Sequence, residues 1–453
     1  MSYTLTPSIN SNKVFILQKS EIEKRLDPLY YYQNIFSFLK NTKHKVYSLC
    51  EVVNYTIAGF GVGKEEQDLT ETGYIQIRPT NIDELGLLKF NRNIYLDEEY
   101  LTAKKSNIIQ KNDILFNNTN SQELVGKTAF FNLDGIYFHS NHITRINVKE
   151  EKILPKFLWI LLNIYQQKKI FYTICTNWNN QSGVGLELLN SLKILVPEKE
   201  IQKQVIDIHE KSLLQKQQNE AEAEKLLASI DGYLLKELGI ELPAQINNDL
   251  KSRIFITQLS EVSGSRFDPF YNQKNFDAFK YPSSKFSIKR IKEIVIEIKT
   301  GLPVRKDYRI EEGKYPYYGA NGIIGYMNEY THNGIYLVIG QDGYLGNHYV
   351  VEGKFWGSNH NWVLKLKSGY DYHYIKAALD LMKYDYLITG GVIPKLTKES
   401  LESIRLPLPP LEKQKEIADH ITQIRQQARQ LKDKTKEALA KANREIEKII
   451  LGN

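Results

Sequence analysis

The feature that most constrains the fold of this chain is a long internal repeat. Residues 25–30 read RLDPLY and residues 266–271 read RFDPFY, while the segment VPEKEIQKQV at 196–205 returns as LPPLEKQKEI at 408–417. A period of this length is far above the roughly 20–50 residues of a solenoid repeat. The repeat therefore predicts two copies of a whole domain followed by a helix. Such a protein presents two similar but non-identical surfaces, which suits a target with two separated halves.

The composition agrees with two or three ordinary globular domains. The chain has 453 residues, of which 42% are hydrophobic, and domains average roughly 150 residues. Cys50 and Cys175 are the only cysteines, so a disulfide framework is excluded and a reducing compartment is expected. Residues 1–19 show no secretion signal pattern, and the apolar run 157–162 is far below the roughly 20 residues of a membrane span. We expect a soluble, cytoplasmic protein.

The charge distribution says more than the net charge of +7. The two globular regions are basic, whereas the stretch 198–240 is acidic and the stretch 410–453 is basic. Basic domains joined to helices of opposite charge fit a protein that faces phosphate groups. Many proteins without a polyanionic partner reach the same net charge, so this feature alone supports the interpretation only weakly.

Each globular region is followed by a long helical pattern. Apolar residues at 417, 421, 424, 428, 431, 435, 438, 442 and 449 form a stripe with steps of four and three residues, and 410–450 contains no glycine or proline after Pro410. A helix of about forty residues is about 60 Å long, and a stripe of this kind is typical of coiled coils. The helix after Pro197 has a poorer stripe and ends at Gly239. Their opposite charges favour a pairing in which the two helices lie side by side, although each helix could instead pack only on its own domain.

The expected fold class is α+β, with two mixed α/β domains rich in strands and turns. Residues 74–78 alternate as a strand should, residues 111–116 resemble a turn leading into a strand, and residues 315–326 form a Gly-punctuated segment before the apolar run 335–340. The expected organisation is an N-terminal extension (1–24), a first globular domain (25–197), a first spacer helix (198–240), a connector (241–265), a second globular domain (266–409) and a second spacer helix (410–453).

Three motifs suggest enzymes, and none of them is complete. The DPLY and DPFY segments resemble the DPPY motif with which amino-methyltransferases hold a flipped adenine, but the second proline is missing in both copies. The loop AGFGVG at 58–63 resembles an S-adenosylmethionine loop, yet it has no acidic ribose partner, and the second copy shows no equivalent loop. Glu297 and Lys299 match only the E-x-K half of a nuclease signature. The sequence contains no phosphate-binding GK[ST] loop and no cluster with metal-ligand spacing, so we expect no catalytic, cofactor or metal site.

Three histidines lie in polar, turn-rich segments. His139 and His142 flank Asn141, and His360 follows Ser358 and Asn359. Each histidine could be structural. The same residue types, together with asparagine, glutamine, serine and arginine, also bond to base edges in DNA grooves.

Taken together, these segments resemble the specificity subunit of type I restriction–modification systems over essentially all of residues 20–450. The resemblance rests on the R-[LF]-D-P-x-Y opening of each copy, NDILF at 112–116 followed by VGK at 125–127, YPYYGANGIIGY at 315–326 with GKFW at 353–356, LLASIDGYLLKEL at 226–238 and LPLPPLEKQ at 406–414. The segment VPEK at 196–199 departs from the family pattern because the double proline and the following leucine are absent.

This resemblance implies two target-recognition domains that each read one half of a split DNA sequence. It also implies an antiparallel pair of helices that spaces them and docks two modification (methyltransferase) subunits, which would bind S-adenosylmethionine and methylate adenine N6. Restriction (motor–nuclease) subunits would join for cleavage. The chain itself would then be a non-catalytic, DNA-binding member of the complex with no cofactor of its own.

We expect the DNA-reading residues to be polar and close to glycine or asparagine turns. The expected DNA-binding residues are Arg78, Asn81, Asn117, Asn118, Ser121 and Lys127 in the first domain, and Tyr318, Asn321, Gln341, Asp342, Lys354, Asn359 and His360 in the second. Two other function classes stay open at this point. The chain could be a self-contained adenine-N6 DNA methyltransferase with drifted motifs, or a two-headed coiled-coil adaptor that does not bind DNA.

Overall fold

The chain divides into two compact units. The computed structural model describes residues 42–67, 71–178, 181–241, 282–304, 310–342, 347–382, 384–388 and 394–451, with the single residues 16, 19, 254, 256, 258, 259 and 272. Unit 1 comprises residues 1–217 and 435–453, and unit 2 comprises residues 218–434. The repeated RLDPLY and RFDPFY segments, most of the extension predicted at 1–24 and most of the connector predicted at 241–265 lie outside the described residues.

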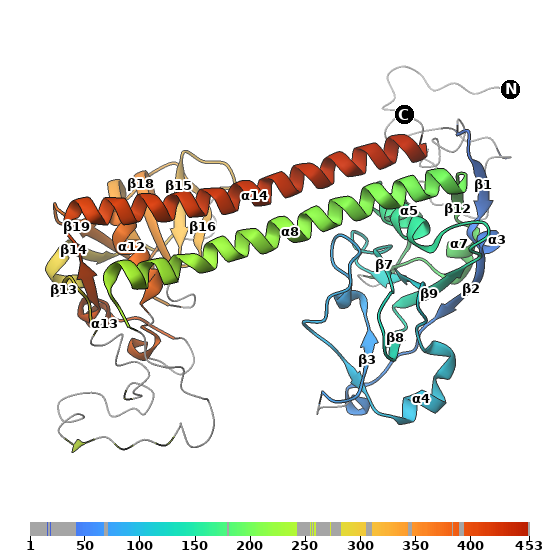
Figure 1. Cartoon of the computed structure of the whole chain (residues 1–453), viewed down its shortest axis with the longest axis horizontal. Coiled ribbons are helices and arrows are strands. Elements are labelled where there is room, and N and C mark those ends of the chain that lie inside the picture. Colours follow the sequence, from blue (N-terminus) through green and yellow to red (C-terminus); the bar gives the residue numbers. More distant parts are fainter. Residues whose placement is uncertain are drawn as a thin grey trace. The chain divides into compact units, whose positions relative to one another are not determined.

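Unit 1 is an α/β structure, and many of its elements are labelled in Figure 1. In chain order they are β1 (Lys45–Ser48), α3 (Leu49–Val52), β2 (Val53–Ala58), η2 (Lys64–Glu66), β3 (Tyr74–Ile77), η3 (Pro79–Asn81), β4 (Tyr95–Leu96), α4 (Glu99–Ala103), η4 (Lys105–Asn107), β5 (Ile114–Asn117), β6 (Thr119–Asn120), β7 (Thr128–Phe130), β8 (Tyr137–His139), β9 (Ile143–Val148), α5 (Pro155–Gln167), α6 (Ile170–Ile174), β10 (Thr176–Trp178), β11 (Gln181–Gly183), α7 (Leu186–Ser191), β12 (Lys193–Val196) and the first part of α8 (Lys199–Leu238).

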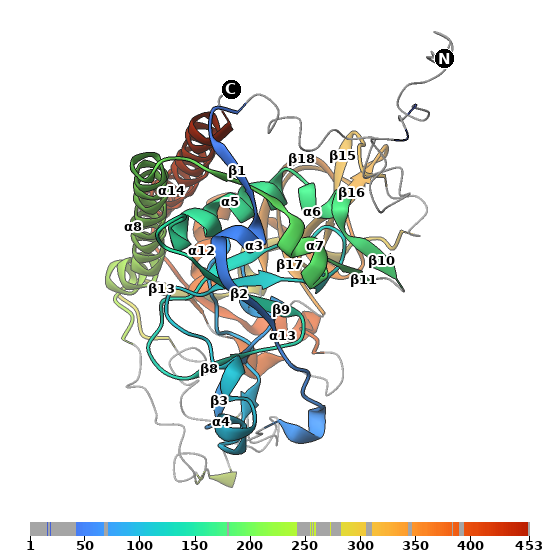
Figure 2. The ribbon, with the colours of Figure 1, turned by 90° about the vertical axis from the view of Figure 1, so that its right-hand side faces the viewer.

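The central sheet of unit 1 separates two apolar layers. Its strand order is β2-β9-β5-β7, and all neighbours are antiparallel. Since side chains alternate between the faces of a strand, Ile114 and Phe116 contact the layer that contains α5, whereas Leu115 belongs to a second cluster with Ile77 of β3. Helices α5 and α7 accordingly lie on one side of β2 and β9, and β3 and α4 on the other (Figure 2).

Unit 2 repeats this order of elements. They are β13 (Ser287–Arg290), α11 (Ile291–Ile294), β14 (Val295–Thr300), β15 (Tyr315–Gly319), β16 (Gly322–Met327), β17 (His332–Gly340), β18 (His348–Gly357), β19 (Asn361–Leu366), α12 (Tyr372–Leu381), η7 (Asp385–Leu387), α13 (Lys398–Ser403), β20 (Arg405–Leu408) and the first part of α14 (Leu411–Leu451). Strand β3 confirms the strand predicted at 74–78, and β5 confirms the strand predicted after the turn at 111–116. The segments 315–326 and 335–340 also form strands, namely β15, β16 and part of β17.

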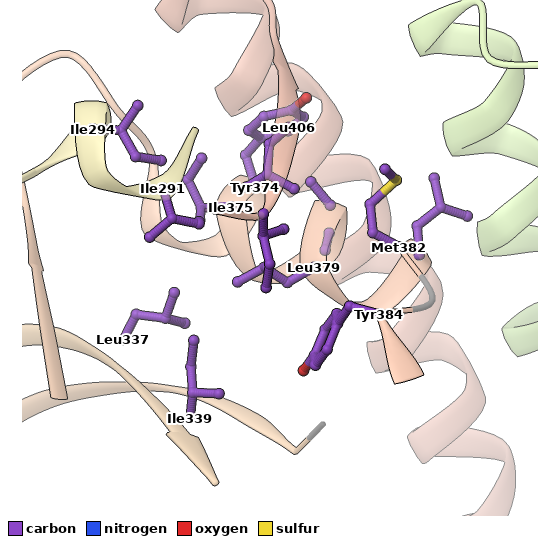
Figure 3. Packing of buried hydrophobic residues seen from close by; sticks show 14 of the residues in the cluster. Ile291, Ile294, Leu337, Ile339, Tyr374, Ile375, Leu379, Met382, Tyr384 and Leu406 are labelled. Carbon is purple, nitrogen blue, oxygen red and sulfur yellow. The ribbon is translucent and has the colours of Figure 1, made fainter. Parts of the chain in front are cut away.

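The sheet of unit 2 has the order β14-β19-β17-β18-β15-β16. Leu337 and Ile339 on one face pack against α11 and α12 (Figure 3), and Val338 on the other face belongs to a separate cluster with Val351 and Phe355. The backbone contacts repeat those of unit 1, because β1 pairs with β12 as β13 pairs with β20. The two units are thus two versions of one architecture.

Both predicted long helices are present. Helix α8 ends before Gly239, whose φ of +63° belongs to the left-handed region that favours glycine at a helix end. In α14 the predicted stripe from Ile417 to Ala442 is buried except for the half-buried Leu431 and Ala438, and it then continues through Ile446 and Ile450 instead of Ile449. Steps of four residues at this end keep the stripe on the face of a straight α-helix, which has 3.6 residues per turn.

A buried glutamine fixes the start of each long helix, and this explains why the segment at 196–205 is repeated. In unit 1 the side chain of Gln202 accepts a hydrogen bond from the Leu154 N–H at 2.8 Å and donates to the Pro197 carbonyl at 2.8 Å. In unit 2 Gln414 accepts from the Asp371 N–H at 2.9 Å and donates to the Pro409 carbonyl at 2.8 Å. Both glutamine side chains are buried, so each joins its helix rigidly to the α/β layer.

Within each unit, opposite ends of the two long helices meet. In unit 1, Val205 near the start of α8 shares an apolar cluster with Ile446 and Ile450 near the end of α14. In unit 2, Glu237 near the end of α8 forms an ion pair of 2.8 Å with Lys413 near the start of α14. No helix among the described residues is long and apolar enough to cross a membrane.

Candidate nucleic-acid interface

The same Ser-Asn-His turn precedes the central strand β9 in unit 1 and β19 in unit 2. Its residues are 140–142 in unit 1 and 358–360 in unit 2. The serine N–H donates to the Ile77 carbonyl at 3.0 Å in unit 1 and to the Tyr318 carbonyl at 2.9 Å in unit 2. The turn therefore has the same place at the end of β3 and of β15.

A glycine packs against the back of each turn. A Cβ atom at Gly59 would lie 2.2 Å from the carbonyl oxygen of Ser140, and one at Gly301 would lie 2.3 Å from that of Ser358. Both distances are shorter than any tolerated contact, so only glycine fits. Residues 300–304 thus take the place of residues 58–62, although of the glycines in that segment they share only the first. In both units this loop braces a turn.

Amide side chains hold the front of each turn. The backbone N–H and the Nδ2 group of Asn118 donate to the two carbonyl groups of the Asn-His pair of unit 1, at 3.0 and 3.2 Å. The backbone N–H of Gln341 donates to the His360 carbonyl at 3.0 Å, and its Nε2 group donates to the Asn359 carbonyl. Asn118 and Gln341, both predicted to read DNA, are buried and position the turn instead of reaching solvent.

In unit 1 the turn forms one wall of a pocket of about 510 Å³. The lining residues are all neutral or basic: Arg78, Pro79, Thr80, Arg92, Asn93, Ile94, Thr119, Asn120, Ser121, His142 and Gln181. Two predicted residues, Arg78 and Ser121, are among them. Burial lowers the pKa of His142, and the charge of Arg78 lowers it further, so this imidazole is neutral at neutral pH. The pocket offers hydrogen-bond donors and acceptors beside a positive charge, the chemistry that reads base edges.

In unit 2 the corresponding groups are arranged differently. His360 is 54% exposed and its Nδ1 lies 2.7 Å from Asp342 Oδ1, so the histidine of this turn has an acidic neighbour. Asn321, between β15 and β16, accepts a hydrogen bond from Asn347 Nδ2 at 3.1 Å. The structure therefore brings four predicted residues, Gln341, Asp342, Asn359 and His360, together around the second turn.

Other predicted residues lie elsewhere or are enclosed. Asn81 is 1% exposed and bonds to the Lys89 carbonyl at 3.0 Å, and Asn117 is 0% exposed and bonds to the Leu124 carbonyl at 3.1 Å. Lys127 is half-buried, with its carbonyl accepting from the Asn117 N–H at 2.8 Å. Lys354 lies over the ring of Tyr330, 4.7 Å from its centroid and away from the turn. Tyr318 is half-buried and packs edge-on against a buried phenylalanine ring.

The structure adds pocket residues that were not among those predicted, namely His142, Arg92, Asn120 and Gln181. The repeated Ser-Asn-His tripeptide was the available signal for His142, since it is identical in both copies. His139, which precedes this tripeptide, is fully buried and bonds to the Ile143 carbonyl at 3.0 Å, so it is a structural histidine.

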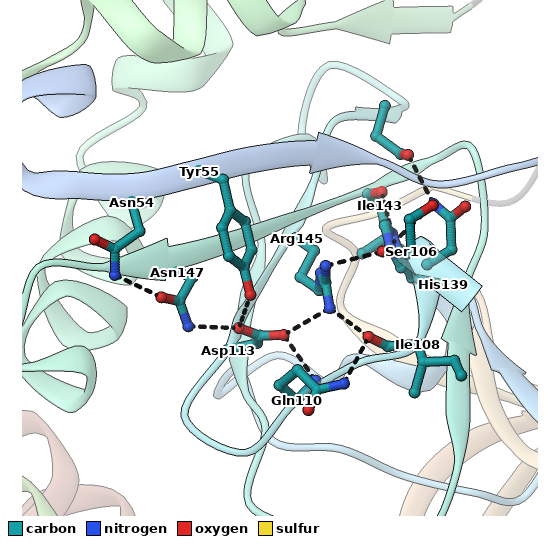
Figure 4. A network of polar contacts seen from close by, with 12 residues as sticks. Asn54, Tyr55, Ser106, Ile108, Gln110, Asp113, His139, Ile143, Arg145 and Asn147 are labelled. Atoms are coloured by element: carbon teal, nitrogen blue, oxygen red, sulfur yellow. Dashed lines mark hydrogen bonds and ion pairs between the residues drawn. The ribbon is translucent and has the colours of Figure 1, made fainter. Parts of the chain in front are cut away.

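A buried polar network supports unit 1 from within (Figure 4). Asp113 of the NDILF segment pairs with Arg145 at 3.3 Å and accepts a hydrogen bond from Asn147 at 2.9 Å. Burial raises the pKa of Asp113, and these partners oppose that shift. The network is enclosed, so it shapes the domain and offers no surface to a ligand.

A family model described as "Type I restriction modification DNA specificity domain" matches residues 41–230 and 283–441. A type I restriction enzyme specificity subunit of Haemophilus influenzae is 39% identical over 123 residues, which cover 25% of this chain and 31% of that protein. The type I restriction enzyme MjaX specificity subunit of Methanocaldococcus jannaschii is 27% identical over 357 residues, covering 75% of this chain and 77% of that protein.

A solved structure has a similar fold. Its title describes complex assembly and conformational transition of the type I R-M system. The TM-score is 0.52 at 16% identity, and the alignment covers 90% of this chain and 97% of that one. At this identity the similarity concerns the fold alone.

Proposed function

This chain belongs to the type I restriction–modification DNA specificity family, and we propose from this that each of its two units reads one half of a bipartite DNA target. The observation that carries the proposal is the Ser-Asn-His turn, which occurs in both units on the same backbone frame. The groups beside the turn differ, with arginine and amides in unit 1 and a His-Asp pair in unit 2. Two frames of one shape with different side chains suit two different half-sites.

We also propose that the chain is a non-catalytic, cytoplasmic subunit. Partner modification subunits would bind S-adenosylmethionine and methylate adenine, and restriction subunits would join them. Incubation of the purified chain alone with labelled S-adenosylmethionine and DNA should transfer no label. Transfer by the lone chain would support the alternative of a self-contained methyltransferase. Failure to bind any duplex with the modification subunits present would support the adaptor alternative.

The long helices are proposed to form one antiparallel coiled coil that spaces the two readers and docks the partners. Support comes from the ends of the helices, where the start of one helix packs against the end of the other in each unit. The Glu237–Lys413 ion pair joins a glutamate of the acidic helix to a lysine of the basic helix.

The decisive experiment replaces one of the two proposed DNA-recognition domains. Residues 25–197 would be replaced by the matching region of a relative with a known target, and the chain would be co-expressed with its modification subunits. We expect the map of methylated adenines to change in one half of the target and to keep the other half. A change in both halves would contradict the proposal of two separate readers.

A further inference from the structure

The Arg78 guanidinium is held along one edge by a buried side chain. Its Nε and Nη2 groups donate to Gln76 Oε1 at 3.2 and 3.0 Å. Gln76 is 0% exposed, and its Nε2 group donates to the Phe60 carbonyl at 2.9 Å, which fixes the orientation of the amide. The backbone N–H of Arg78 is also held, by Asn81 Oδ1 at 3.0 Å.

This arrangement leaves the other edge of the guanidinium to the pocket. An arginine side chain has five N–H groups, and Gln76 takes up two of them. The remaining three belong to Nη1 and Nη2, the pair of nitrogens whose spacing matches two neighbouring acceptors. A guanine presents such a pair, O6 and N7, in the major groove.

Resting on the proposed function, we infer that Arg78 is the residue with which unit 1 recognises a guanine in its half-site, and that Gln76 positions it. Side-chain freedom lost on binding costs affinity, so an arginine already fixed along one edge loses less when it binds. A phosphate contact needs no such fixed orientation, because phosphate contacts set register without reading sequence. Arg78 is half-buried in the pocket wall, where a base edge can enter beside amide groups.

Two positions in the chain serve as comparisons. Arg92 lines the same pocket but is exposed, which is the usual setting of a phosphate-binding arginine. In unit 2, the residue after Tyr318 is Gly319, at the position that Arg78 has after Ile77. Unit 2 therefore reads its half-site without this arginine, and that half-site becomes an internal control for folding and assembly.

The first test maps methylated adenines made by the chain co-expressed with its modification subunits. The methylation map of the wild-type complex is measured first. If it shows no bipartite target, the result refutes the proposed function rather than this inference. With Arg78→Gln, discrimination should fall about 5- to 150-fold at a single G·C pair of one half-site, and the other half-site should stay unchanged. Arg78→Lys should lose part of this discrimination, because a lysine is a flexible point charge without the rigid planar fork of an arginine.

Arg92→Gln is the matched control. It should weaken binding evenly over all target variants and reduce the dependence of binding on salt, as loss of a phosphate contact does. The inference is overturned if both Arg78 variants weaken binding evenly as well, or if the relaxed position is an A·T pair. An unchanged map for both Arg78 variants, beside a bipartite wild-type map, would overturn it too.

The role of Gln76 is tested with Gln76→Leu, which removes the acceptor oxygen. We expect partial loss of discrimination at the same G·C pair, with the remaining bases of that half-site still specified. A merely structural role would relax every base of the half-site together. That outcome would contradict the positioning role.

Discussion

At the scale of single residues, Asp113 and Arg145 form an ion pair inside unit 1, and each depends on the other to compensate its charge. Both side chains are almost fully buried, and Arg145 also donates to the Ser106 carbonyl at 2.9 Å. Arg145→Met should destabilise unit 1 by about 3–5 kcal/mol, because it leaves a buried carboxylate without its partner. The double variant Arg145→Met with Asp113→Asn should recover part of this loss. Chemical denaturation measures both, and equal stability of the single and double variants would contradict the coupling.

A buried histidine makes the stability of unit 1 depend on pH. Burial lowers the pKa of His139 to about 4, and the charge of Arg145 adds to this shift. The unfolded chain binds a proton near pH 6.5, which the folded chain accepts only near pH 4. Stability should therefore be unaffected above pH 6.5 and fall by about 3 kcal/mol as the pH drops from 6.5 to 4.

Hydrogen exchange of the β9 amides, which reports the opening of unit 1, measures this effect in the full chain. His139→Gln removes the titrating group and serves as the control. The wild type should lose stability relative to this variant between pH 6.5 and 4. Parallel pH profiles of the two proteins would show that His139 does not carry the effect.

At the scale of elements, the two buried glutamines at the starts of α8 and α14 should contribute more to the stability of the fold than the exposed residues beside them. Gln414→Leu removes the partner of the half-buried Asp371 N–H and of the buried Pro409 carbonyl. Each such group costs about 1–3 kcal/mol. The matched control is Gln204→Leu, since Gln204 is exposed on α8. If thermal unfolding shifts equally for the two variants, the glutamine at 414 does not anchor its helix.

The elements were easier to predict from sequence than the site. Helical stripes repeat over many residues, so α8 and α14 followed from periodicity, and strand alternation gave β3. Most strands of the two main sheets were not predicted. The turn residues did not follow from periodicity, because an asparagine near a turn can face solvent or bond to the backbone inside it. Asn81 and Asn117 do the latter. The packing role of Gly301 was not predicted, because the carbonyl group that excludes a side chain there belongs to a residue distant in sequence.

At the scale of the whole molecule, we propose that the length of α8 and α14 sets the number of base pairs between the two half-sites. Four residues inserted after Gln217 of α8 add about 6 Å of helix and advance it by slightly more than one turn, so the apolar stripe stays nearly in register. DNA rises about 3.4 Å per base pair. The gap between the half-sites should therefore lengthen by one or two base pairs, with both half-sites unchanged in the methylation map.

Two inserted residues are the control for this change. They rotate the stripe by about 200° and should disrupt the pairing of the helices and the activity of the complex. A four-residue insertion that gives an active complex with an unchanged gap would show that another element sets the spacing.

In the Ser-Asn-His turn of each unit, the residues that support the backbone are different from the residues that face the proposed target. Gly59 and Asn118 fix the backbone in unit 1, and Gly301 and Gln341 do so in unit 2, in each case through contacts with the backbone of the turn. Changes to the outward side chains therefore leave the supporting contacts intact. Substitutions of these side chains can therefore change the recognised DNA sequence while the stability of the domain stays nearly constant. One fold could recognise many different targets in this way.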